Sequence, residues 1–149
     1  MKVKQIMNRH VISVKPETPV KEIAKKLIQY NITGVPVVND KEEIIGIVTE
    51  FDLIRREGKI DIPAYINILD SFLYLEDPSE VEKELRKMIG TTAEEIMTKE
   101  VKTINPEAEI SELAELIEDE HINPVPVVKE GKLVGIVSRA DIVRLLARE

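Results

Sequence analysis

Several features that define common classes of protein are missing from this chain of 149 residues. It has no cysteine, which excludes disulfides and thiolate chemistry. No apolar run approaches the roughly 20 residues of a membrane-spanning helix, so we expect no membrane partner. Residues 1–4 lead into a repeat with no visible signal peptide, which together with the lack of cysteine predicts a cytoplasmic protein.

The residue groups that carry catalysis or nucleic-acid binding are missing as well. The net charge is −7, whereas nonspecific binding to nucleic acid needs a basic surface, so no nucleic-acid partner is expected. The six glycines are too scattered for a P-loop or a dinucleotide fingerprint. His10 and His121 are the only histidines, and we interpret them as solvated or turn residues because no metal-ligand spacing surrounds them. No nucleophile, base and orienting residue can be named together, so the sequence predicts no enzyme and no required cofactor.

The chain does contain one pattern twice, at residues 6–55 and 96–144. The offset is 90 residues until one residue is lost in a turn, after which it is 89. Because a unit of this size buries little apolar surface alone, we expect the copies to pack face to face about a pseudo-twofold axis. Such a pair has a central cleft with two equivalent corners. The matching segments are Ile6-Met7 with Ile96-Met97, Val35 to Val38 with Val125 to Val128, Gly46 to Thr49 with Gly135 to Ser138, and Asp52 with Asp141.

Each repeat predicts the element order β-α-β-β-α. A short extended piece, Val11 to Val14, precedes a helix for which Thr18 is the expected N-cap and Pro19 the first residue. Two apolar runs, Gly34 to Val38 and Ile44 to Val48, flank a short polar turn and predict a β-hairpin. A second helix follows from Asp52. The fold class is therefore α/β of the mixed α+β kind, with two β-α-β-β-α repeats and a helical connector.

The connector separates a first repeat at residues 1–56 from a second at 91–149. Residues 57–90 have no flexible Gly/Ser stretch, and their apolar spacing predicts a helical hairpin. This hairpin covers an edge of the repeats or forms a dimer surface, with Tyr65, Phe72 and Tyr74 as candidate anchors.

Two short motifs leave a strand and open a helix: Thr49-Glu50-Phe51-Asp52 and Ser138-Arg139-Ala140-Asp141. The pattern [ST]-x-x-[DE] is a capping box, which satisfies the N–H groups at the start of a helix. A helix N-terminus also attracts anions, so the hydroxyl could hold a phosphate and the carboxylate could accept ribose hydroxyls. Both interpretations stay open from the motif alone.

The ordered set of motifs, present twice, resembles the cystathionine-β-synthase-type (CBS) domain, and two in tandem resemble a Bateman module. The set is Ile-Met, Pro-Glu, a helix, Gly-Val-Pro-Val-Val and Gly-Ile-Val-Thr-x-x-Asp, and the resemblance covers residues 1–56 and 91–149. It implies a regulatory module that senses AMP, ADP or ATP between the repeats, with AMP favoured. It also implies a homodimer and an unidentified effector protein. The alternatives are an S-adenosylmethionine sensor and an interaction module that binds no nucleotide.

The resemblance implies two ligand sites, each drawing on both repeats. In one corner Asp141 would accept the ribose hydroxyls, Ser138 would hold phosphate with Arg139 beside it, and the first repeat would surround the adenine. Arg139 attracts a phosphate, whereas Glu50 in the mirror corner repels it, so we expect the Asp141 corner to bind better. The remaining implied residues are Ile12, Ile32, Thr33 and Gly34 around the first base, and Thr49, Asp52, Ile122, Asn123 and Pro124 in the mirror corner.

Overall fold

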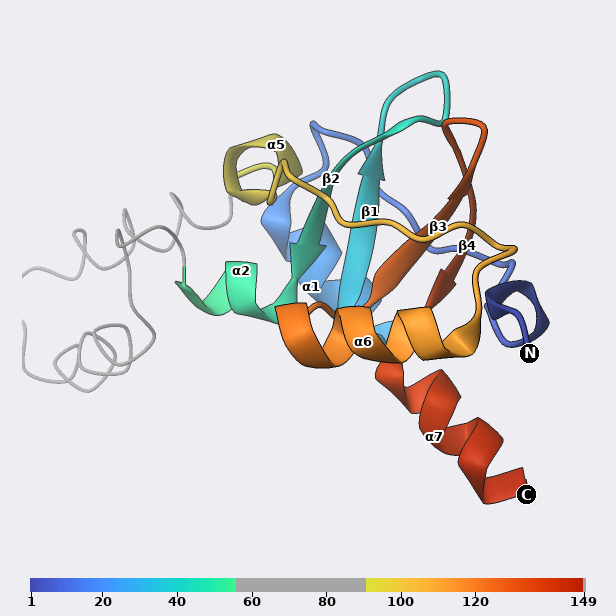
Figure 1. Cartoon of the computed structure of the whole chain (residues 1–149). Coiled ribbons are helices and arrows are strands. Elements are labelled where there is room, and N and C mark those ends of the chain that lie inside the picture. Colours follow the sequence, from blue (N-terminus) through green and yellow to red (C-terminus); the bar gives the residue numbers. More distant parts are fainter. Residues whose placement is uncertain (56–90, 149) are drawn as a thin grey trace, which may run out of the picture.

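The structure is a computed structural model of the whole chain, and it describes residues 1–55 and 91–148 (Figure 1). The expected connector at 57–90, with Tyr65, Phe72 and Tyr74, lies outside the described residues. The elements are η1 (Val3–Gln5), α1 (Val20–Gln29), β1 (Gly34–Val38), β2 (Ile44–Thr49), α2 (Glu50–Arg55), α5 (Ala93–Ile96), α6 (Ile110–Glu120), β3 (Val125–Lys129), β4 (Lys132–Val137) and α7 (Arg139–Arg148).

The two predicted hairpins are confirmed. β1 pairs with β2 and β3 with β4, both antiparallel, and each ladder shifts register at the same place, between Val37 and Val38 or between Val127 and Val128. The two hairpins lie side by side with α1 and α6 against them (Figure 1). The mixed α+β fold of two repeats is thus as expected from the sequence.

The strand predicted before the first helix of each repeat is too long. In the structure only its last residue, Val14 or Ile104, pairs with a strand. Val14 pairs in parallel with Val37, donating to the Pro36 carbonyl at 3.0 Å and accepting from the Val38 N–H at 2.9 Å. Extending this ladder back to Ile12 would require an N–H from Pro36, which proline lacks. Pro126 stops the equivalent ladder at Ile104 in the second repeat.

The helix starts also differ from expectation. Pro19, not Thr18, is the N-cap of α1, and the Thr18 hydroxyl instead accepts the Lys15 N–H at 3.0 Å. The second helix of each repeat begins two residues before its aspartate, at Glu50 and at Arg139. Asp52 and Asp141 consequently lie in the first turn of their helices.

The outer edge of each hairpin pairs with one residue near the start of the other repeat. Ile47 in β2 exchanges backbone hydrogen bonds with Thr98, and Ile136 in β4 does the same with Asn8. The methionines found at matching places pack there, since Met97 joins the first repeat's hydrophobic core and Met7 the second's. A side chain at Gly46 would overlap Met97, and one at Gly135 would come within 2.6 Å of the Met7 sulfur. The repeats therefore exchange segments and cannot act as separate beads.

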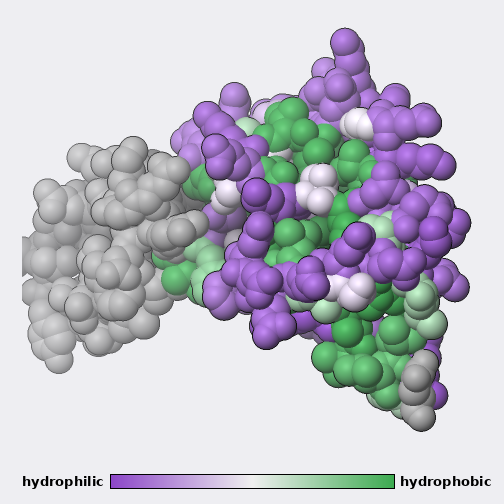
Figure 2. Space-filling model, viewed as in Figure 1, coloured by the Kyte–Doolittle hydropathy of each residue, from purple (hydrophilic) through white to green (hydrophobic). Residues whose placement is uncertain are grey.

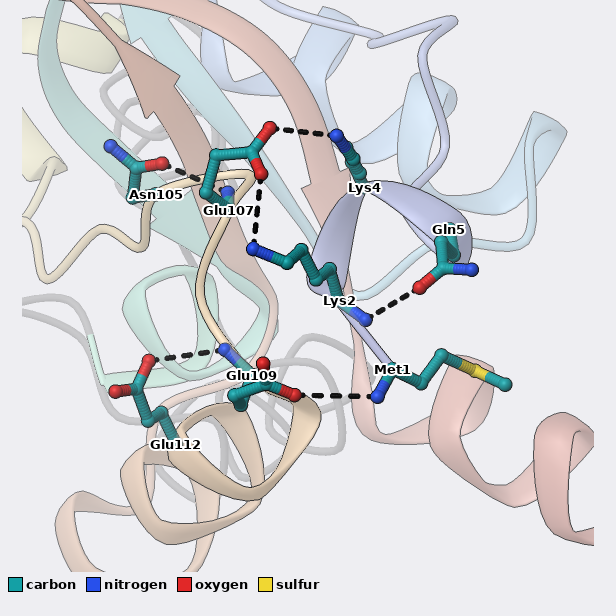
Figure 3. Close-up of polar contacts among 8 residues, drawn as sticks. All are labelled: Met1, Lys2, Lys4, Gln5, Asn105, Glu107, Glu109 and Glu112. Atoms are coloured by element: carbon teal, nitrogen blue, oxygen red, sulfur yellow. Dashed lines mark hydrogen bonds and ion pairs between the residues drawn. The ribbon is translucent and has the colours of Figure 1, made fainter.

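The N-terminal segment is the clearest case of this exchange, because it packs on the second repeat (Figure 3). Val3 is fully buried in the core of that repeat. Lys4 and Lys2 contact the Glu107 carboxylate at 2.8 and 3.3 Å, and both contacts lower the pKa of Glu107 below its ordinary value. These ion pairs are exposed, so the buried Val3 side chain carries most of the attachment.

We predict that Val3→Ala lowers the free energy of unfolding by about 1.5–3 kcal/mol, the amount typical for losing a buried aliphatic side chain. Lys4→Ala removes only an exposed ion pair and should lower the free energy of unfolding much less than Val3→Ala does. Urea unfolding monitored by circular dichroism measures both. A Val3→Ala cost no larger than that of Lys4→Ala would show that the N-terminal segment is not part of the second core.

Candidate functional site

Two pockets lie on either side of the line where the repeats meet, and each is lined by both repeats. One has a volume of about 410 Å³ and contains Asp141; we call it the Asp141 pocket. The other has about 650 Å³ and contains Asp52; we call it the Asp52 pocket. Both volumes lie in the range of small-molecule sites.

All twelve residues implied by the sequence line one of these pockets. The Asp141 pocket contains Ile12, Ile32, Gly34, Ser138 and Asp141, and the Asp52 pocket contains Thr49, Asp52 and Ile122. Four residues line both pockets: Thr33, Asn123, Pro124 and Arg139. Arg139 was expected in the Asp141 corner alone, and it contributes to the Asp52 pocket as well.

The two helix-opening motifs form one half of the capping box, in which the carboxylate accepts the N–H of the residue before the helix. In the first repeat the Asp52 Oδ2 accepts the Thr49 N–H at 2.8 Å and lies 3.2 Å from its hydroxyl. In the second the Asp141 Oδ2 accepts the Ser138 N–H at 2.8 Å and lies 3.1 Å from its hydroxyl. One oxygen of each carboxylate is therefore engaged by its own turn.

The second oxygen distinguishes the two pockets. Asp52 is only 5% exposed, and its Oδ1 accepts the Thr98 hydroxyl at 3.1 Å. Asp141 is more accessible, with a side chain 20% exposed, and its Oδ1 accepts from Arg144 Nη1 at 2.8 Å. A ligand reaching Asp52 would have to contact a nearly buried carboxylate, whereas one reaching Asp141 meets a more accessible carboxylate that is held by an exposed arginine.

The wall between the pockets is made by residues at matching positions of the repeats. The Asn123 amide lies 3.5 Å from the Thr33 hydroxyl, and its oxygen accepts the Arg139 N–H at 2.9 Å. Gly34 allows Pro124 to approach closely, because a Cβ there would lie 2.9 Å from the proline Cδ. Contacts between the two repeats thus separate the two pockets.

Several lining residues were not predicted from the sequence. Asn31 and His121 occupy matching positions, each in the left-handed conformation after a helix, and each lines one pocket. The repeat register could have identified them, because each directly precedes the residues expected around a base: Asn31 precedes Ile32, and His121 precedes Ile122. The other unpredicted residues with polar, charged or aromatic side chains include Asn8, His10, Tyr30 and Arg144 in the Asp141 pocket, and Thr98, Glu100 and Lys102 in the Asp52 pocket.

Two features are absent from the part of the chain that the structure describes. Residues 1–55 and 91–148 contain no group of three or more histidine, aspartate or glutamate side chains placed to hold a metal ion. Over the same ranges, no helix combines the length and apolar character needed to span a bilayer.

Comparison with known proteins identifies the family. The CBS domain model matches residues 3–59 and 93–148, more than half of the chain. An uncharacterised protein of Methanopyrus kandleri is 32% identical over 147 residues, which are 96% of this chain and 61% of that protein. The chain thus spans less than two thirds of this relative's length.

Two solved structures show the same fold with adenosine compounds bound. CBSX2 of Arabidopsis thaliana in complex with AMP has a TM-score of 0.71 and 25% identity, covering 99% of this chain and 96% of that one. The CBS domain pair of protein MJ0100, in complex with 5′-methylthioadenosine and S-adenosyl-L-methionine, has a TM-score of 0.71 and 28% identity, covering 99% and 97%. With both repeats matched, this chain belongs to the CBS domain family and carries two CBS domains in tandem.

Proposed function

We propose that this chain is a regulatory module without catalysis that binds an adenosine-containing ligand, AMP in the first place, in the Asp141 pocket. The observation that carries the proposal is the convergence there of a carboxylate, a hydroxyl and a helix N-terminus from one repeat with apolar side chains from the other. The AMP complex of CBSX2 and the S-adenosylmethionine complex of MJ0100 support an adenosine ligand.

Each part of AMP would meet a suitable group in this pocket. The ribose hydroxyls can donate to the Asp141 carboxylate, and the phosphate can accept from the Ser138 hydroxyl at the start of α7. The adenine can lie against Ile12 and Ile32 of the first repeat. This division assigns phosphate and sugar to the second repeat and the base to the first.

The Asp52 pocket would bind adenylates more weakly. Its carboxylate is buried and accepts from Thr98. The acidic residues Glu50, Asp52 and Glu100 line this pocket against the basic Lys102 and Arg139, whereas in the Asp141 pocket Arg139 and Arg144 face one acidic residue, so the Asp52 pocket attracts a phosphate less. A second site there remains part of the proposal, with Ile122, Asn123 and Pro124 around the base.

A thermal-shift panel of AMP, ADP, ATP, adenosine and S-adenosylmethionine tests the proposed function. A ligand that binds only the folded chain at a hundredfold excess over its dissociation constant stabilises by about 2.7 kcal/mol, which corresponds to a rise in Tm of roughly 5–10 °C. We expect the largest rise with AMP. A larger rise with S-adenosylmethionine would favour the alternative sensor, and no shift with any compound would favour an interaction module that binds no nucleotide.

The two aspartates should differ in calorimetric titrations with AMP. Asp141→Ala removes hydrogen bonds to a charged group and should weaken AMP binding about ten- to a hundredfold. Asp52→Ala should matter less for AMP, provided that the variant retains the wild-type circular dichroism spectrum. Equal losses, or a larger loss for Asp52→Ala, would place the stronger site in the other pocket.

We also propose that the chain forms a homodimer. None of the ten residues of α7 is buried, and apolar side chains gather at the end of the molecule where α7 projects (Figure 2). Val143 and Leu146 are 62% and 69% exposed. Phe51 and Ile54 on α2, the matching helix of the first repeat, are exposed too, so a second copy could cover both helices by a self-complementary pairing.

Light scattering at micromolar protein should give about twice the chain mass of 16.9 kDa. Leu146→Glu places a charge on the exposed apolar face and should shift the protein to monomer. Gln29→Glu, an equal change of charge on the exposed side of α1, is the control and should leave the mass unchanged. A monomeric wild-type chain would rule out the dimer.

A further inference from the structure

Arg144 reaches from the second turn of α7 to the carboxylate that the proposed function assigns to the ribose. Its Nη1 donates to Asp141 Oδ1 at 2.8 Å, while the other oxygen is engaged by Ser138. Both oxygens of the carboxylate therefore have protein partners. A ribose that hydrogen-bonds to this carboxylate must share or displace one of them.

The two partners are unequal in how easily they can leave. The Ser138 N–H is a backbone group at the start of α7, so losing its contact would leave a helix N–H unsatisfied. The Arg144 side chain is 65% exposed, and an exposed ion pair of this kind contributes little net stability. Ribose binding should therefore release Arg144 and keep the Ser138 contact.

A phosphate offers the released guanidinium a new partner. Arg144 lines the same pocket as Ser138 and Arg139, and a guanidinium binds phosphate oxygens through two parallel hydrogen bonds. The charged and titratable groups that line this pocket with it are Asp141, Arg139, His10 and Tyr30. Asp141 is the only acidic residue among the described residues that line this pocket, so a bound phosphate would add the second negative charge to which Arg144 can turn.

We propose that Arg144 determines the preference of the Asp141 pocket for nucleotides over nucleosides. It gives up Asp141 to the ribose and takes the phosphate in exchange. Adenosine would displace Arg144 with nothing in return, whereas AMP would supply the replacement partner. This inference rests on the proposed function and extends it from the class of ligand to the residue that selects within that class.

Calorimetric titration of wild type and Arg144→Gln with adenosine and with AMP tests the proposal. The variant should bind AMP about tenfold or more weakly, because a charged hydrogen bond is lost. Its affinity for adenosine should stay constant or rise by up to about fivefold, since the competing ion pair is gone. The ratio of AMP to adenosine affinity should therefore fall at least tenfold.

Arg148→Gln is the matched control, because it removes the same charge one turn further along the exposed helix and Arg148 is not among the pocket residues. It should leave both affinities unchanged. Equal losses of AMP and adenosine in Arg144→Gln would mean that Arg144 only orients Asp141 and would overturn the inference alone. Wild-type protein that binds neither ligand would overturn the proposed function together with the inference.

Discussion

Each hairpin of this chain is paired at its outer edge with the opening segment of the other repeat. Thr98 pairs with β2 and Asn8 with β4, and the methionine beside each fills the space left by a glycine in the opposite hairpin. An uncovered strand edge exposes N–H and C=O groups that tend to pair with other chains. The exchange therefore protects both edges, and it also holds the repeats at the separation that leaves a pocket on either side of their contact.

The helix-opening turns serve the fold and the pockets with the same atoms. Asp52 accepts the Thr49 N–H and Asp141 accepts the Ser138 N–H. These hydrogen bonds fix each carboxylate at the N-terminus of its helix. The capping interpretation and the ligand interpretation are thus compatible, since capping occupies one oxygen and leaves the other for a second partner. The repeats differ in that partner and in the burial of the carboxylate: the nearly buried Asp52 accepts from Thr98, and the more accessible Asp141 accepts from Arg144. The same turn, present in both repeats, thus places its aspartate in two different surroundings.

Much of the fold could be predicted because it depends on local pattern. Alternation between apolar runs and polar turns identified both hairpins. The resemblance to the CBS domain implied twelve site residues, all of which line one or both of the two pockets. The loss of the first strand could have been foreseen, since Pro36 and Pro126 remove the N–H that a longer ladder needs. The partners of the aspartates could not, because Thr98 contacts Asp52 across 46 residues through the segment exchange, which no periodicity encodes. The contact of Arg144 with Asp141 is local, three residues apart, but the sequence does not say which side of the carboxylate it takes.

The central claim is that the contact between two exchanged repeats builds an adenylate site around Asp141. A crystal structure of the chain grown with millimolar AMP tests it most directly. The account predicts ribose hydroxyls on the Asp141 carboxylate, adenine between Ile12 and Ile32, and the phosphate at the start of α7. AMP bound only around Asp52, or on a surface outside both pockets, would contradict it.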